Sequence, residues 1–484
     1  MQKYVNHSPS KGFVLELQPA PAWSAMLGFA LVSALCLLVH AGGVLRLGFP
    51  LGALMVGILL YWRYPILYLG FTWWIYFLTP WIRRLIDQQG GWVDPSTVML
   101  TPYLVTGIAI ATLIKYLPIA YRQGGLPFIL GLVGVLHGVL IGLVLNPFTA
   151  VVPAALNWVS PLLFGFHLLM HWQDYPRYRR VLRRVFLWGV FVMGAYGVWQ
   201  FMTAPPWDQY WMLNAPINSI GSPAPFEIRV FSTMNAPGPF ATTMMAGLLL
   251  LFDSQGAVRL PAAGFGYLSF LLSLVRSAWL GWVVGLLAAI TSLKAHLQMR
   301  LLITLLVMAL GVLPLVTMPP FSETIQSRLQ TFTNPQQDQS YSDRTAGYRE
   351  SLNAAFSQFL GQGFGNTEIE NNYSIGVRDS ALLDMFFSLG WFGSIPYFGG
   401  LCLLSFALLQ CVEAKVDGFI NAARAIAFGV LAQFGFGSVM LGVTGMLLWG
   451  FAAMAMAGHR YYQQQQIGAQ NLTPLVTRPI GQTS

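Results

Sequence analysis

The chain has 484 residues, of which 55% are hydrophobic and only 9% are charged, and its formal net charge at pH 7 is +9. A chain of this length with so few charged side chains could not fold as one water-soluble domain without exposing large apolar patches. The composition excludes a soluble globular protein and predicts an integral membrane protein with several spans.

Apolar runs of spanning length recur along the chain, and a helix needs about 20 such residues to cross the hydrocarbon core of a bilayer. Because the runs are continuously apolar, whereas the strands of a membrane barrel alternate, they favour helices. We expect an all-α, polytopic transmembrane helix bundle of roughly 12 to 14 helices, the first three of which the hydropathy separates poorly. The clearest runs, in chain order, are 22–39, 126–145, 185–202, 281–292, 301–316 and 422–440.

The same pattern divides the chain into successive parts. They are a cytoplasmic amino-terminal segment 1–22, amino-terminal transmembrane helices 23–203, core transmembrane helices 204–317 with an outer loop 204–235, a large outer segment 318–380, carboxy-terminal transmembrane helices 381–458, and a cytoplasmic tail 459–484. The tail contains a glutamine run without apolar periodicity, so we expect it to be disordered.

The densest basic cluster, 176–184, sets the orientation because short loops rich in Lys and Arg remain in the cytoplasm. Alternating the spans from this cluster places 203–231, 276 and 318–380 outside, and 121–122, 253–259, 294–300, 411–417 and the tail inside. The same alternation places Arg83 and Arg84 outside, against the rule. Either this pair is a further outer site or the early spans are wrongly divided, and the second interpretation is slightly favoured.

The outer segment 318–380 is too long for an idle connection and too short for an independent domain. Helical spacing of apolar residues predicts two amphipathic helices, one over 321–332 and one over 348–359, lying on the membrane surface or on the bundle. We expect the glycines at 361, 363 and 365 to end the second helix with a tight turn. No strand precedes them and no helix-opening Lys-Ser/Thr follows, so a nucleotide-binding loop is disfavoured.

Several arginines lie on the predicted outer side, where the positive-inside rule predicts few. They are Arg229, Arg276, Arg344, Arg349 and Arg378. A guanidinium binds phosphate in a bidentate way and keeps its proton, so these arginines are candidates for binding an anion. The alternative is that they form surface ion pairs with neighbouring acids such as Glu227, Asp343 and Asp379, each worth less than about 1 kcal/mol. Arg276 has no acid nearby in sequence, and a charge between two apolar runs is costly unless it faces a polar cavity.

A set of short motifs carries a family resemblance. They are Arg229-Val-Phe-Ser-Thr-Met-Asn-Ala-Pro-Gly-Pro-Phe-Ala241, then 273–280 around Arg276, 343–350 with two arginines, 361–365, 379–383 and Gly390-Trp-Phe-Gly393. In this order and spacing, over roughly residues 180 to 450, they resemble the O-antigen ligase and O-antigen polymerase family. The helices before residue 180 match that family only in hydropathy.

Members of this family are integral membrane glycosyltransferases of the GT-C type that use polyprenyl-diphosphate-linked sugars outside the cytoplasmic membrane. The resemblance therefore implies a GT-C-like bundle in the bacterial cytoplasmic (inner) membrane, with the large outer segment and the active site facing the periplasm. It also implies an inverting glycosyltransferase with a polyprenyl-diphosphate-linked oligosaccharide as donor and a glycan or lipid as acceptor. A chain-length regulator and a flippase are candidate partner proteins, and no nucleic acid is expected.

The resemblance also assigns roles to the residues that match the motifs. It implicates Arg229, Arg276 and Arg344 in handling the donor diphosphate, and Arg276 and Arg344 are our candidates for stabilising the leaving group. Arg349 and Arg378 are further candidates for substrate binding. We expect no cofactor and no metal, because His167 with His171 and the acidic pair at 368 and 370 each lack a further ligand nearby in sequence.

Glycosyl transfer also needs a group that accepts the proton of the acceptor hydroxyl. Where the ligase branch often has a histidine, this chain has Asp379, which makes Asp379 the candidate base and favours the polymerase over the ligase. Asp343, Glu350 and Glu227 are lesser candidates, and Asp379 is as readily explained as a helix cap. Asp384 would cost about 2.5 to 3.5 kcal/mol facing lipid, so we expect it to face the bundle interior or a cavity. We interpret it as a residue that supports the site or contributes to the acceptor site.

The sequence is also compatible with two other classes of protein. A transporter or flippase for lipid-linked sugars would also be polytopic and rich in arginine, although transporters tend to show internal repeats and charges near the membrane midplane. No repeat is evident here, and the charge gathers on one face. A non-catalytic scaffold of an envelope complex would make the arginines individually dispensable.

Overall fold

The computed structural model describes residues 19–215, 218–292, 352–366 and 380–472, together with single residues between 298 and 322. These parts contain fifteen α-helices, several short 3₁₀ turns and no β-strand; one isolated antiparallel bridge joins Gly221 and Ile228. The all-α polytopic bundle predicted from the sequence is confirmed. The helices are α1 Ala20–Leu38, α2 Gly42–Arg63, α3 Pro65–Gly90, α4 Thr101–Gly107, α5 Ile110–Tyr116, α6 Leu126–Leu145, α7 Phe148–Met170, α8 Tyr175–Thr203, α9 Pro206–Asn214, α10 Pro237–Leu251, α11 Arg259–Leu272, α12 Arg276–Ser292, α17 Ala381–Gln410, α18 Gly418–Leu431 and α19 Gly442–Leu472.

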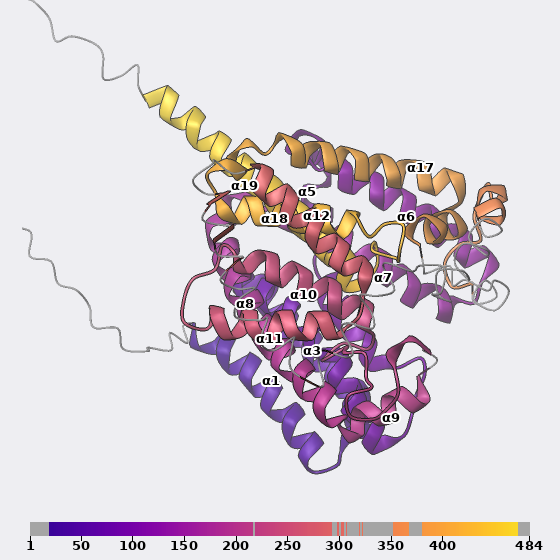
Figure 1. The fold of residues 1–484 in the computed structure, drawn as a ribbon. Helices are drawn as coiled ribbons and strands as arrows, with labels where there is room; N and C mark the ends of the chain where they lie inside the picture. Colours follow the sequence, from indigo (N-terminus) through magenta and orange to yellow (C-terminus); the bar gives the residue numbers. More distant parts are fainter. Residues whose placement is uncertain are drawn as a thin grey trace, which may run out of the picture.

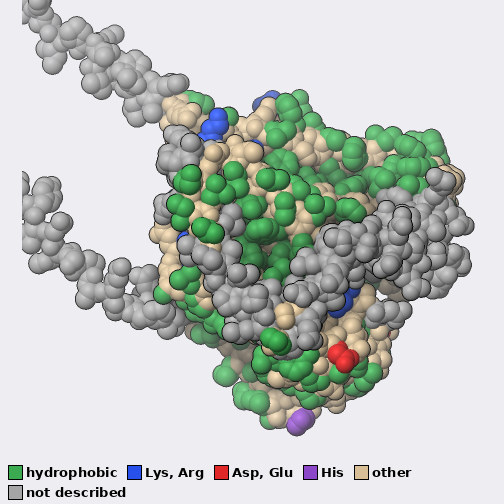
Figure 2. All heavy atoms as spheres, in the orientation of Figure 1, with side chains coloured by type: hydrophobic (Ala, Val, Ile, Leu, Met, Phe, Trp, Pro, Cys, Tyr) green, Lys and Arg blue, Asp and Glu red, His purple; other side chains and the backbone are tan. Residues whose placement is uncertain are grey.

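Seven helical segments among the described residues are long and apolar enough to cross a membrane, and three further apolar helices are shorter. The surface agrees with this assignment: on the face shown in Figure 2, the described side chains are mostly hydrophobic and few charged groups are visible. Helix α1 has only Ala22 and Ser33 buried along its length. An apolar surface of this extent fits contact with lipid rather than water.

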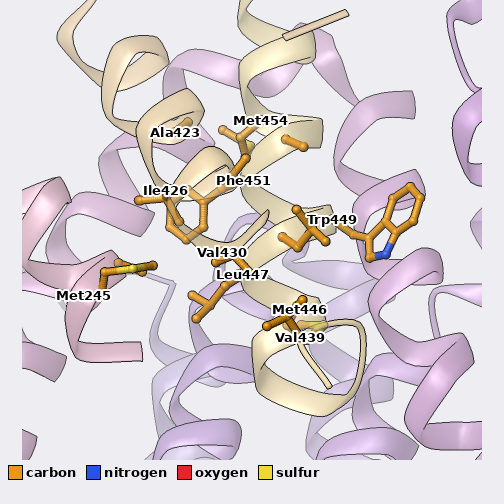
Figure 3. Close-up of a cluster of buried hydrophobic side chains, with 14 of the residues drawn as sticks. Met245, Ala423, Ile426, Val430, Val439, Met446, Leu447, Trp449, Phe451 and Met454 are labelled. Carbon is orange, nitrogen blue, oxygen red and sulfur yellow. The ribbon is translucent and has the colours of Figure 1, made fainter. Parts of the chain in front are cut away.

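Helix α10 is the centre of the bundle. Every residue from Phe240 to Leu251 is buried, and α10 packs against α8, α11, α12, α18 and α19. Figure 3 shows the part of the core in which Met245 of α10 lies near Ile426 and Val430 of α18 and Leu447 of α19. Because α10 begins at Pro237, within the motif that starts at Arg229, this packing fixes the position of that motif relative to most of the bundle.

Small residues let several helices cross at close range. A Cβ atom built on Gly281 of α12 would lie 2.7 Å from Gln433 Nε2 and closer still to the carbonyl oxygen of Gly429 in α18. Gly134 of α6 meets Gly393 of α17 in the same way. Membrane helices associate largely through such close packing, because lipid supplies no hydrophobic force between them.

One end of the bundle, called here the basic end, is held together by carboxylates. Asp417 caps α18 and accepts hydrogen bonds from Tyr175 (2.9 Å), Arg179 (2.8 Å) and Tyr462 (2.9 Å). Asp253, after α10, lies 3.4 Å from Arg183 of α8. Burial raises the pKa of the Asp253 carboxyl to about 6, and Arg183 opposes this shift.

These contacts agree with the alternation predicted from the basic cluster. Residues 175–183, 253, 417 and 462 meet at the basic end, whereas α8 runs from this end to the loop 204–235 at the opposite end. We call the opposite end the site end, because it carries the candidate residues described below.

Two predicted boundaries were wrong. The tail expected to be disordered from residue 459 continues as helix α19 to Leu472, which extends beyond the bundle in Figure 1. Glutamine is a good helix former, and Arg460 anchors the helix by donating to the carbonyl oxygen of Gln123 at 2.8 Å. The apolar run 422–440 also crosses a helix end, because α18 stops at Leu431 and a connection over 432–441 follows.

Candidate functional site

Arg84 lies at the site end in a buried ion pair. Its Nη1 atom is 2.6 Å from Asp208 Oδ1, the side chains of both residues are fully buried, and its Nη2 atom donates to the carbonyl oxygen of Ser232. The neighbouring Arg83 bonds Asp87 and Asp94. The favoured prediction, that the early spans are wrongly divided around this pair, was therefore wrong. Arg84 is at the same end as the loop 204–235, to which it is bonded across 124 residues of sequence.

A polar network extends from this ion pair into the motif that begins at Arg229. Gln200 Nε2 donates to Asp208 Oδ2 at 2.7 Å, and Gln200 Oε1 accepts from the backbone N–H groups of Phe231 (3.1 Å) and Ser232 (2.8 Å). Tyr196 also donates to Asp208, at 2.9 Å. Burial raises the pKa of the Asp208 carboxyl, whereas Arg84 and these hydrogen bonds favour its ionised form. The network thus connects α3, α8 and α9 to the segment before α10.

Arg229 caps the turn between α11 and α12. It donates to the carbonyl oxygens of Ser273 (Nε, 3.3 Å), Leu274 (Nη2, 3.1 Å) and Ser219 (Nη1, 2.8 Å). The first two oxygens follow the last turn of α11, where carbonyl groups have no partner within the helix and the helix dipole is negative. These bonds, rather than an ion pair with Glu227, are what the described contacts of Arg229 show.

Arg276 is the first residue of α12 and is partly buried. Leu274, two residues before it, has φ 56°, a left-handed conformation that ends α11 and turns the chain into α12. The structure therefore brings Arg229 and Arg276 to the same turn. An arginine at a helix start adds its charge to the positive end of the helix dipole, an arrangement that favours an anion.

Asp384 lies in the first turns of α17 and is buried. It accepts hydrogen bonds from Ser388 (3.2 Å) and from Ser438 (2.6 Å), which belongs to the 432–441 connection. The expectation that this carboxylate faces the bundle interior is confirmed.

The connection 432–441 links α12 and α17 at the site end. The N–H of Ala381 donates to the carbonyl oxygen of Phe434, and Gln433 packs against Gly281 of α12 while it accepts from Thr242 of α10. Arg276 and Asp384 therefore lie in the first turns of α12 and α17, and both helices contact this connection.

The glycine motif at 361–365, called here the clamp, packs its backbone closely against three helices. Residues 352–357 are helical, and Gly361, Gly363 and Gly365 follow with φ values of 76°, 70° and 85°, as the predicted tight turn requires. Their backbone inserts between α6, α7 and α17. The N–H of Gln362 bonds the carbonyl oxygen of Phe387 at 2.8 Å, and Asn146 Nδ2 donates to two carbonyl oxygens of the motif. A Cβ atom on Gly363 would overlap the backbone of α6, so close approach, not phosphate binding, explains this glycine.

Several sequence candidates have other structural partners or lie outside the described residues. Arg344, Arg349, Arg378 and Asp379 are outside them, as are Asp343, Glu350 and the first amphipathic helix predicted at 321–332. In the outer loop 204–235, Trp211 is buried against Arg83, with 4.8 Å between the guanidinium and the ring centroid.

His167 and His171 have contacts that do not require a metal. His167 is buried and hydrogen-bonded to Thr112 at 2.7 Å, and His171 bonds the carbonyl oxygen of His167. Within the described part of the chain, no three His, Cys, Asp or Glu side chains gather as metal ligands would.

Sequence reasoning missed Asp208 and Gln200 as members of the site end, and it gave Arg84 as an outer site only in the less favoured of two interpretations. The signal that could have identified Arg84 was its conflict with the positive-inside rule, which here marked a buried pair instead of a misplaced span. The fold and its surface define a helical membrane protein that carries Arg229 and Arg276 together at the α11–α12 turn. A scan against protein-family models and a search of curated proteins find no match to this chain.

Proposed function

We propose that this protein is a membrane glycosyltransferase that polymerises polyprenyl-diphosphate-linked oligosaccharide units. The observation that carries the proposal is the cationic turn, defined as the α11–α12 turn with Arg229 and Arg276. It stands at the end of an apolar helix bundle, where the diphosphate of a membrane-embedded lipid would lie.

The physical argument concerns charge at the membrane surface. A diphosphate leaving group gains negative charge as its bond to the sugar breaks, so catalysis requires donors aimed at the phosphoryl oxygens. Arg276 and the start of α12 supply positive charge at one point, and Arg229 neutralises the negative end of α11 that would otherwise repel an anion there.

In the proposed reaction, a hydroxyl oxygen of the acceptor glycan attacks C1 of the donor sugar from the face opposite the diphosphate. The C1–O bond to the diphosphate breaks, polyprenyl diphosphate leaves, and the hydroxyl proton passes to a carboxylate. Asp379 is the candidate for that carboxylate by its position, where the ligase branch has a histidine, and the family resemblance assigns a second arginine, Arg344, to the leaving group. Asp384, held by Ser388 and Ser438, would orient the acceptor side of the site.

The absence of the ligase histidine favours the polymerase over an O-antigen ligase. The proposal includes a bacterial inner membrane, an active site on the periplasmic side, and no metal or cofactor. A chain-length regulator and a flippase are the partner proteins that such a reaction would involve.

The test is glycan transfer by the purified protein in nanodiscs, with polyprenyl-diphosphate oligosaccharide as both donor and acceptor and EDTA present. Arg276→Ala and Arg344→Ala are compared with the wild type. Arg177→Ala is the matched control, because its exposed side chain lies at the basic end. We expect elongated lipid-linked glycan from the wild type and the control, and a loss of about a hundredfold or more for the two site variants.

Two results would redirect the assignment. Transfer only when a different lipid acceptor is supplied would indicate the ligase reaction. No transfer by folded wild type with either acceptor, together with movement of the lipid-linked sugar across vesicles, would indicate a transporter.

A further inference from the structure

We infer that Arg84, Asp208 and Gln200 are positioning residues that hold Arg229 and the cationic turn in place. The geometric part of this inference stands on the described contacts alone, and its consequence for the donor rests on the proposed function. None of the three side chains is accessible, since each is completely buried. They would act through the segment 228–232 instead of touching a substrate.

The segment needs to be held because it contains an unfavourable backbone conformation. Ser232 has φ 50°, in the left-handed region that residues with a Cβ seldom adopt. Such a conformation is energetically unfavourable and persists only where the surroundings fix it.

The network supplies that fixation from both sides of the peptide. Gln200 Oε1 accepts the N–H groups of Phe231 and Ser232, Arg84 donates to the carbonyl oxygen of Ser232, and the hydroxyl of Ser232 donates to the carbonyl oxygen of Met193 at 2.6 Å. Asp208 orients both Arg84 and Gln200 by accepting from each of them. Removing one member leaves a buried polar partner without its bond, which makes the network act as a unit.

The held segment leads directly to the cationic turn. The N–H of Val230 donates to the carbonyl oxygen of Leu272 at 3.1 Å, and the N–H of Arg229 donates to that of Ile220 at 3.0 Å. Gly197 of α8 permits this fit, because a Cβ there would lie 2.8 Å from Val230 Cγ1. A change in the backbone at Ser232 therefore displaces Arg229 relative to the end of α11.

Arginine is required at position 84 because two different nitrogens reach two different acceptors. Lysine has a single ammonium group and cannot span Asp208 and Ser232 in the same geometry. Arg84→Lys keeps the positive charge and loses the second nitrogen donor. It therefore distinguishes a requirement for positioning from a requirement for charge. Gln200→Met keeps the volume and removes both the amide donor and the acceptor.

The experiment measures hydrogen–deuterium exchange of peptides covering 228–234 and the kinetics of transfer in Arg84→Lys and Gln200→Met. Asp417→Asn is the matched control, since it breaks a comparable buried carboxylate hub at the basic end of α8. We expect faster exchange over 228–234 in the two network variants and unchanged exchange there in the control. The donor KM should rise by about tenfold with kcat within about twofold, because a displaced Arg229 weakens binding in ground and transition states alike.

A purely structural role predicts a different pattern. Loss of folded enzyme lowers the apparent kcat in all three variants and leaves KM unchanged, and that result, or unchanged exchange over 228–234, would overturn the inference. If the wild type shows no transfer while the network variants still exchange faster over 228–234, the positioning of Arg229 stands and the proposed function fails.

Discussion

Replacing Gly281 with alanine tests how closely α12, the helix that begins at Arg276, must approach α18. The added Cβ would lie 2.7 Å from Gln433 Nε2, 2.9 Å from Met245 Sδ and nearer still to the backbone oxygen of Gly429. Ordinary contact begins near 3.4 Å, and the Gly429 oxygen belongs to the α18 backbone and lies nearer than 2.7 Å, so the two helices must separate by more than about 0.7 Å. Overpacking of this kind costs about 1 to 3 kcal/mol.

The matched control is Gly264→Ala in α11, where a built Cβ meets nothing within 4 Å. There the change should stabilise the helix by up to about 1 kcal/mol, because alanine loses less backbone entropy than glycine. We expect the two variants to differ by about 2 kcal/mol or more in the free energy of unfolding, measured by denaturant titration in detergent. Equal stability of the two variants would refute the close α12–α18 crossing.

Three further predictions concern stability. Burial raises the pKa of the Asp253 carboxyl to about 6, so protonation of this carboxyl stabilises the folded state. That stabilisation is complete below about pH 4, is lost as pH rises through 6, and is worth up to about 3 kcal/mol. Asp253→Asn should remove this pH dependence from melting curves recorded from pH 4 to 7. Gly363→Ala, at φ 70° and against Gly142 of α6, should lower the melting temperature by several degrees, and an unchanged value would contradict the clamp. Asp208→Leu should lower the free energy of unfolding by about 3 to 5 kcal/mol, because the buried Arg84 loses its partner. The double variant Asp208→Leu/Arg84→Met should lower it by less, and additive losses would contradict a coupled buried pair.

The fold class was predictable because continuous apolar runs and a dense basic cluster are local signals. The inward orientation of Asp384 followed from the cost of a carboxylate in lipid, and the turn at Gly363 from its glycine spacing. The Arg84–Asp208 pair could not be predicted, since its partners are 124 positions apart and only the folded bundle brings them together. The continuation of α19 beyond residue 459 depends on tertiary contacts such as Tyr462 with Asp417, which hydropathy does not register.

The wrong interpretation of Arg84 has a general physical cause. The positive-inside rule describes charges exposed at the membrane surface, and it carries no information on an arginine that is neutralised inside the protein. A charge that violates the rule is then better explained by a buried partner than by a misplaced span.

The proposed function is tested most directly by transfer of polyprenyl-diphosphate-linked glycan by purified wild type and Arg276→Ala in nanodiscs, with Arg177→Ala as the control. We expect elongated lipid-linked glycan from the wild type and the control, and a loss of about a hundredfold or more for Arg276→Ala of equal melting temperature. Full elongation by folded Arg276→Ala would contradict the role of the cationic turn.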